Sequence, residues 1–123
     1  MALDFARRLA VAACAMAGVL LGATNASAHA HLESAAPAPD SNVAAPATVT
    51  LHFTEALEPR FSGFEIADAH GARVNAPSGV GQDPATLVAT PAAPLAAGAY
   101  TVTWHIVARD GHRMRGTYAF TVH

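Results

Sequence analysis

The stretch Tyr100-Thr-Val-Thr-Trp-His-Ile-Val107 carries the pattern that decides the fold. Large apolar side chains occupy every second position, at Tyr100, Val102, Trp104 and Ile106. Successive side chains of a β-strand point to opposite faces of the sheet. This period of two therefore predicts a strand with one buried face and one more polar face.

The same alternation recurs elsewhere in the chain, at residues 48–54 (Val49, Leu51, Phe53) and 118–122 (Tyr118, Phe120, Val122). Shorter strand candidates lie at residues 63–67, 72–75 and 86–90. Stretches rich in proline, glycine and alanine separate them, at residues 35–46, 76–84 and 91–98. No window after residue 29 has helical periodicity. Many short strands between such turns predict an all-β fold, a sandwich or a Greek-key barrel, in a single domain of residues 29–123.

The N-terminal segment has the three parts of an export signal. Arg7 and Arg8 give it a positive start, an apolar run covers residues 9–21, and Ala26-Ser27-Ala28 is a small-x-small cleavage site. The run is too short for a comfortable membrane span. We therefore predict a signal peptide, residues 1–28, that is removed after Ala28. An uncleaved N-terminal anchor is the alternative, and no later segment is predicted to cross a bilayer.

The composition after residue 28 excludes several classes of protein. This part of the chain contains no cysteine, so it offers neither a disulfide nor a thiolate ligand or nucleophile. It also has no lysine, and its five arginines face eight acidic residues. Nucleic-acid binding needs a basic face that neutralises phosphates, so we do not expect nucleic acid as a partner.

Cleavage after Ala28 would make His29 the first residue of the exported chain. Its free α-amine and its imidazole can together close a chelate ring on a metal ion. His31 opens a second possibility, because an amine followed by a third-position histidine can wrap Cu(II) or Ni(II) with two deprotonated backbone amides. If Leu32 joins a strand, the fold holds the amide of Ala30 and favours the chelate at His29. His31 is then a hydrogen-bond partner beside the metal.

A second group of metal-binding side chains follows directly on the strand at residues 100–107. In the sequence Arg109-Asp110-Gly111-His112, an extended chain would point Asp110 and His112 to the same side. Gly111 leaves room for a close approach above them. A carboxylate and an imidazole presented together are suitable ligands for a borderline divalent ion. The competing interpretation is an ordinary turn, because Asp-Gly is a common turn dipeptide.

Taken in order, several motifs resemble the CopC/PcoC family of periplasmic copper-binding proteins. They are His-Ala-His-Leu-Glu-Ser-Ala-Ala-Pro-Ala from residue 29, Leu51-His-Phe-Thr-Glu-Ala-Leu-Glu-Pro59, Tyr-x-Val-x-Trp at 100–104, Asp110-Gly-His112 and Gly116-Thr-Tyr-Ala-Phe-Thr-Val122. The resemblance covers essentially all of residues 29–123. It implies a seven-stranded Greek-key β-barrel of cupredoxin or immunoglobulin-like kind. It also implies tight Cu(II) binding, in copper resistance or uptake, beside a CopD-type membrane protein.

Carried over by position, the resemblance implies one Cu(II) per chain, bound by the amine and imidazole of His29, a nitrogen of His112 and an oxygen of Asp110. Three nitrogens and one oxygen in a near-square plane suit Cu(II). Glu55 matches a glutamate near the copper in some members, which implies an outer-sphere or axial role. Met114 is the only methionine after residue 28, so we expect no Met-rich Cu(I) site.

The leading hypothesis is therefore a monomeric, non-enzymatic periplasmic protein that sequesters or delivers Cu(II). The alternative is a copper-dependent oxidative enzyme, because an N-terminal histidine brace is also the copper unit of oxidative polysaccharide-cleaving monooxygenases. The small size, the lack of an evident aromatic substrate platform and the Asp110 ligand oppose that alternative. A structural adhesion-type sandwich without metal affinity is the third possibility.

Overall fold

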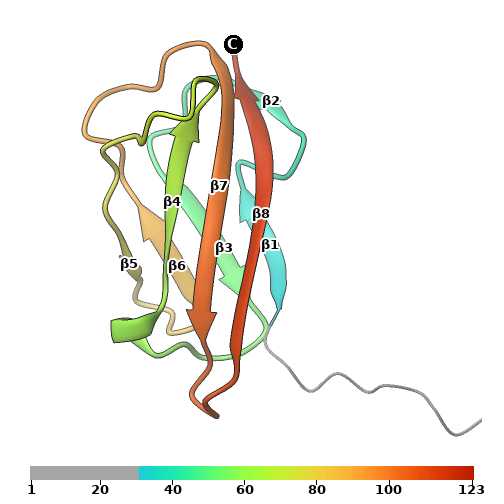
Figure 1. Cartoon of the computed structure of the whole chain (residues 1–123), viewed down its shortest axis with the longest axis vertical. Coiled ribbons are helices and arrows are strands. Elements are labelled where there is room, and N and C mark those ends of the chain that lie inside the picture. Colours follow the sequence, from blue (N-terminus) through green and yellow to red (C-terminus); the bar gives the residue numbers. More distant parts are fainter. Residues whose placement is uncertain (1–30) are drawn as a thin grey trace, which may run out of the picture.

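The computed structural model describes residues 31–123, which form two four-stranded β-sheets packed face to face (Figure 1). Sheet A has the strand order β1 (Leu32–Ala36), β3 (Val49–Phe53), β6 (Thr86–Ala89) and β5 (Ser78–Val80). Sheet B has the order β2 (Asn42–Val43), β8 (Arg113–Val122), β7 (Gly98–Val107) and β4 (Gly63–Asp68). The chain changes sheets after β1, β2, β3, β4 and β6, as in Greek-key sandwiches. The predicted all-β sandwich is confirmed, and the predicted signal peptide lies outside the described residues.

The strands expected at residues 48–54, 63–67, 86–90, 100–107 and 118–122 are confirmed as β3, β4, β6, β7 and β8. The strand expected at residues 72–75 is wrong, because this segment joins β4 through a single bridge between Ala67 and Arg73. Three short strands, β1, β2 and β5, were not predicted; β2 and β5 lie within the stretches rich in proline, glycine and alanine at residues 35–46 and 76–84. For β1, a strand at Leu32 was considered only as the condition for the chelate at His29. With the two-residue β2 counted, the described part has eight strands, against the seven that the family resemblance implies. No helix in residues 31–123 is long and apolar enough to span a membrane.

The inner faces of the two sheets form one apolar core around Trp104. The ring of Trp104 on β7 meets Phe53 on β3 edge-on, with ring centroids 5.1 Å apart. Gly116 on β8 lies opposite Trp104 in the ladder. A Cβ atom at position 116 would clash with the indole of Trp104. Glycine at position 116 therefore leaves the space that the indole occupies across the β7–β8 pair.

Two tyrosines of sheet B face inward with different outcomes for their hydroxyl groups. Tyr100 stacks on Phe120 and donates a hydrogen bond of 2.7 Å to the carbonyl oxygen of Ala96. The Tyr118 hydroxyl is buried and has no hydrogen-bond partner among the described residues. Burial raises the pKa of Tyr118 from 10.0 to about 12, because the phenolate would lose its hydration.

Candidate metal centre

A tight turn joins β7 to β8 and carries the predicted Asp110–His112 pair. The strands pair as far as Val107 and Arg113, and residues 108–112 close the hairpin. The Ala108 amide donates to the His112 carbonyl at 2.9 Å, and the Gly111 amide donates to the Ala108 carbonyl at 2.8 Å. Gly111 has a φ of +91°, a conformation that favours glycine. The turn is therefore fixed by its own backbone hydrogen bonds.

Asp110 and His112 do meet, although not as an extended chain would bring them together. The segment is not extended, because Asp110 Oδ1 accepts the His112 amide at 3.0 Å and the chain forms an Asx turn, the competing interpretation of Asp-Gly. This turn places Asp110 Oδ2 2.8 Å from His112 Nδ1. Their side chains are 43% and 52% exposed, so the pair is accessible from solvent.

The spacing of this pair is what a square-planar metal ion requires. Two donor atoms at right angles, each about 2.0 Å from a metal, lie about 2.8 Å apart. Asp110 Oδ2 and His112 Nδ1 already stand at that separation. The same separation is that of a hydrogen bond, so the side chains must turn both donor atoms toward a common point before they can bind one metal ion. The described residues 31–123 contain no group of three or more His, Cys, Asp or Glu side chains that could hold a metal ion.

The segment after β3 connects this turn to the point where the chain enters β1. On one side, the Arg109 amide donates to the Ala56 carbonyl at 3.1 Å, and the buried Leu57 bridges to Ala108. On the other side, Thr54 exchanges hydrogen bonds with His31. The start of β1, the loop after β3 and the β7–β8 turn accordingly lie at one end of the sandwich (Figure 1). The half-buried Glu55 lies on this connecting segment, between Thr54 and Ala56.

The backbone of His31 is held by Thr54 from both sides. Its amide donates to Thr54 Oγ1 at 3.0 Å, and its carbonyl accepts from the Thr54 amide at 3.1 Å. In a peptide that wraps copper through a third-position histidine, that histidine's amide loses its proton to solvent and its nitrogen binds the metal. Leu32 begins β1, which meets the condition under which we expect the chelate at His29 and not the wrapped form at His31. His29 itself, like the amide of Ala30, lies outside the described residues.

A second polar cluster surrounds His52 on the outer face of sheet A. His52 Nε2 lies 3.2 Å from Glu33, and His52 Nδ1 lies 3.5 Å from Asp83 and 2.9 Å from the Thr86 hydroxyl. No sequence motif indicated this cluster, because its members come from β1, β3, β6 and a loop. The two carboxylates face different ring nitrogens, whose lone pairs diverge, so one metal ion cannot join all three side chains.

Comparison with known proteins decides the family. The model of the CopC domain matches residues 32–123. The chain belongs to the CopC family. It is similar to copper resistance protein C of Pseudomonas syringae pv. tomato, with 42% identity over 113 residues that cover 86% of this chain and 89% of that protein. It is also similar to copper resistance protein C of Escherichia coli, with 40% identity over 114 residues covering 85% of this chain and 90% of the relative.

Solved structures of CopC family proteins share the fold. The crystal structure of PcoC from Escherichia coli matches with a TM-score of 0.72 and 40% identity, over 78% of this chain and 100% of PcoC. That protein is described as methionine-rich. This chain has a single methionine in residues 31–123, Met114, which is partly buried and packs against the core. The family resemblance is confirmed, with a marked difference in methionine content.

Proposed function

We propose that this protein is exported to the periplasm, loses residues 1–28 and binds one Cu(II) ion through His29, Asp110 and His112. It would sequester or deliver copper in copper resistance or homeostasis. The observation that carries the proposal is the 2.8 Å separation of Asp110 Oδ2 and His112 Nδ1 at the end of the sandwich where the chain enters β1. The names of the relatives, copper resistance protein C, support the same physiological role.

His29 would supply the two donors that complete a copper plane. It precedes His31 by two residues, and two residues of extended chain span at most about 7 Å. His31 is fixed to Thr54, on the segment that also holds the β7–β8 turn. The amine and imidazole of His29 can therefore approach Asp110 and His112 from a short tether. Three nitrogens and one oxygen result, a set that Cu(II) accepts in its preferred tetragonal geometry.

The donors favour Cu(II) over Cu(I). The Asp110 carboxylate is a hard, anionic ligand, and it stabilises the more highly charged ion. Cu(I) prefers soft thioethers, and Met114 is the one thioether of residues 31–123. Reduction would therefore act as a release step. Glu55, on the segment beside the site, would act from an axial or outer position.

One observation and one chemical argument favour a simple chelate at His29, in a binding protein, over the alternatives. The His31 amide is already a donor to Thr54 Oγ1, so wrapping copper through that amide would cost a hydrogen bond of the fold. Asp110 would fill a position in the copper plane that an oxygenase keeps open for its substrate. We therefore propose a monomeric binding protein, not an enzyme, with a CopD-type membrane protein as its partner.

The test is a competition titration with a Cu(II) chelator on protein purified after export. Mass spectrometry first establishes that the chain begins at His29. One glycine added before His29 should lower Cu(II) affinity by several orders of magnitude, because the amine leaves the chelate ring. One glycine added after His123 is the matched control and should change nothing. Equal Cu(II) affinities for the parent and both glycine variants would contradict the proposal.

A further inference from the structure

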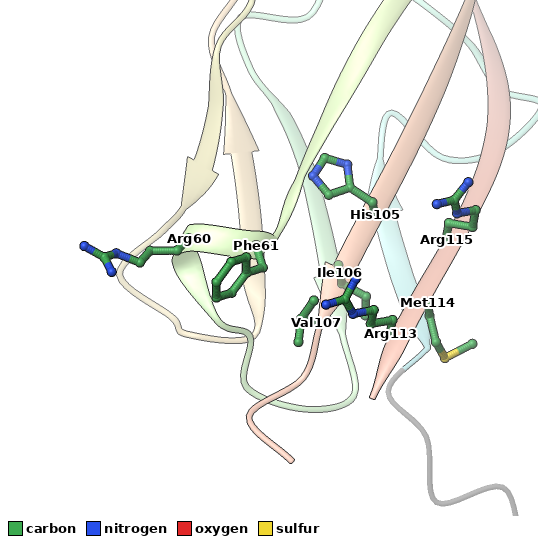
Figure 2. A pocket seen from close by; sticks show the side chains of 8 residues that line it. All are labelled: Arg60, Phe61, His105, Ile106, Val107, Arg113, Met114 and Arg115. Atoms are coloured by element: carbon green, nitrogen blue, oxygen red, sulfur yellow. The ribbon is translucent and has the colours of Figure 1, made fainter. Parts of the chain in front are cut away.

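The outer face of sheet B carries a groove that the proposed copper site does not use. The groove has a volume of about 450 Å³ and lies between η1 (Pro59–Phe61) and the ends of β7 and β8 (Figure 2). His105 and Val107 on β7 pair directly with Arg115 and Arg113 on β8, so these four side chains share the outer face. Met114, between the two arginines, points away from the groove (Figure 2).

Most of the positive charge of this domain gathers around the groove. Residues 31–123 contain five arginines and no lysine, and three of these arginines line the groove: Arg60, Arg113 and Arg115. No carboxylate of residues 31–123 forms an ion pair with any of the three. Arg73, by contrast, is paired with Glu65 at 2.7 Å. Three of the five guanidinium groups thus gather at this groove without a carboxylate partner among residues 31–123.

The groove also has an apolar wall. Phe61 is 59% exposed and is the one large hydrophobic residue of the described part that is exposed. Its ring stands beside the groove, opposite Arg113 (Figure 2). Exposed aromatic rings and arginines are the two kinds of residue most enriched at protein-binding hot spots. A ligand that fits must therefore combine anionic groups with an apolar side chain.

We propose that this groove docks a short acidic segment of a partner protein, with carboxylates on either side of an apolar residue. The carboxylates would pair with Arg113 and Arg115, and the apolar side chain would cover Phe61. Arg113 follows His112 directly, so a segment docked there would hold the partner beside the proposed copper ligands. The proposal that this groove binds an acidic segment depends only on the residues of the groove. Its use in copper transfer rests on the proposed function.

The chemistry of the groove favours a protein segment over a membrane surface or a second copy of the chain. An anionic bilayer is flat and does not fit into a concave groove. It would also require more than one exposed apolar anchor. A concave site with separate charged and apolar walls matches a peptide in which both kinds of side chain alternate.

The experiment uses metal-free protein purified after export, which makes it independent of the copper proposal. The probe is the acetylated and amidated pentapeptide Glu-Asp-Leu-Asp-Glu, titrated while amide chemical shifts are followed by NMR. We expect shifts at Phe61, at Val107 and at the first residues of β8. Affinity should fall as ionic strength rises from about 0.01 M to about 0.15 M, where the Debye length shortens to about 8 Å.

Variants separate specific docking from general attraction. The double variant R113E/R115E should weaken peptide binding by about tenfold or more, because two attractive pairs become repulsive. Phe61→Ala should weaken it without removing the salt dependence. The matched control Arg73→Ala removes an arginine outside the groove and should bind as the parent does.

Three outcomes would overturn the inference. The first is equal peptide affinity in the parent and in R113E/R115E, or shifts that map to another face. The second is binding to vesicles of phosphatidylcholine and phosphatidylglycerol in the absence of any peptide binding. The third is a concentration-dependent dimer, seen by analytical ultracentrifugation, that R113E/R115E abolishes while the peptide fails to compete.

Discussion

The body and the turn of the β7–β8 hairpin are held by different interactions. In the body, Trp104 and Ile106 are buried to within a few per cent, and Gly116 leaves space for the indole. In the turn, Asp110 and His112 stay about half exposed and bind each other and the backbone. Burial therefore stabilises the body, whereas hydrogen bonds shape the turn. A change in one region should alter folding and a change in the other should alter metal binding.

The largest expected effect is on copper and comes from the turn. His112→Ala removes a proposed ligand and should lower Cu(II) affinity by more than the roughly 10- to 100-fold that loss of a ligand's outer partner costs. The free energy of unfolding should change by less than about 0.5 kcal/mol, as for other surface positions. Chelator competition and urea unfolding measure the two quantities. His70→Ala, in another exposed turn, is the control, and parental copper affinity in His112→Ala would place the ligands elsewhere.

The body should show the reverse behaviour. Gly116→Ala puts a methyl group into the space of the Trp104 ring and should cost about 1–3 kcal/mol of unfolding free energy. The folded variant should still bind Cu(II) as the parent does. Gly79→Ala is the matched control, because nothing lies within 4 Å of a Cβ atom at that position. If Gly116→Ala is as stable as Gly79→Ala in urea, the packing of the indole has been misjudged.

Smaller effects come from the two inward-facing tyrosines. Tyr100→Phe should lose about 1 kcal/mol, because the Ala96 carbonyl loses its donor. Tyr118→Phe removes a hydroxyl that has no partner among the described residues, and should gain up to about 1 kcal/mol. Urea unfolding at neutral pH measures both changes. Destabilisation of equal size in the two variants would mean that the Tyr118 hydroxyl is satisfied.

Tyr118 also makes stability depend on alkaline pH. Its pKa is about 12 in the folded protein and 10.0 in the unfolded chain. Below pH 10 both the folded and the unfolded chain keep the Tyr118 proton, so its ionisation does not lower the free energy of unfolding. Above it the unfolded chain releases the proton first, so stability falls as pH rises toward 12. Tyr118→Phe should reduce this fall, and an unchanged alkaline slope in that variant would contradict the assignment.

The body of the hairpin could be predicted from the sequence and the ends of the strands could not. Alternation marks β7 because Val102, Trp104 and Ile106 all face one core. It fails for the first half of β8, where arginines face solvent and glycine replaces a large inner side chain. It also fails for β5, a short edge strand that gains its hydrogen bonds from β6. Edge pairing depends on tertiary neighbours that a local pattern does not contain.

For the candidate site, residue types were predictable but their geometry was not. Asp-Gly-His suggested donors on one side of an extended chain, and the structure joins them through an Asx turn instead. The position of this turn beside the entry to β1 depends on backbone hydrogen bonds of residues 54–57. No sequence motif predicts these hydrogen bonds. The cluster around His52 was missed for the same reason. Its members meet only across the sheet.

The central claim is that the β7–β8 turn and the processed N-terminus share one Cu(II) ion. Electron paramagnetic resonance of the exported protein with one equivalent of Cu(II) tests it most directly, because hyperfine structure counts the bound nitrogens. The account predicts an axial spectrum with three nitrogens, and two in His112→Ala. A four-nitrogen spectrum that is unchanged in His112→Ala would contradict it, since that is the signature of copper wrapped by backbone amides at His31.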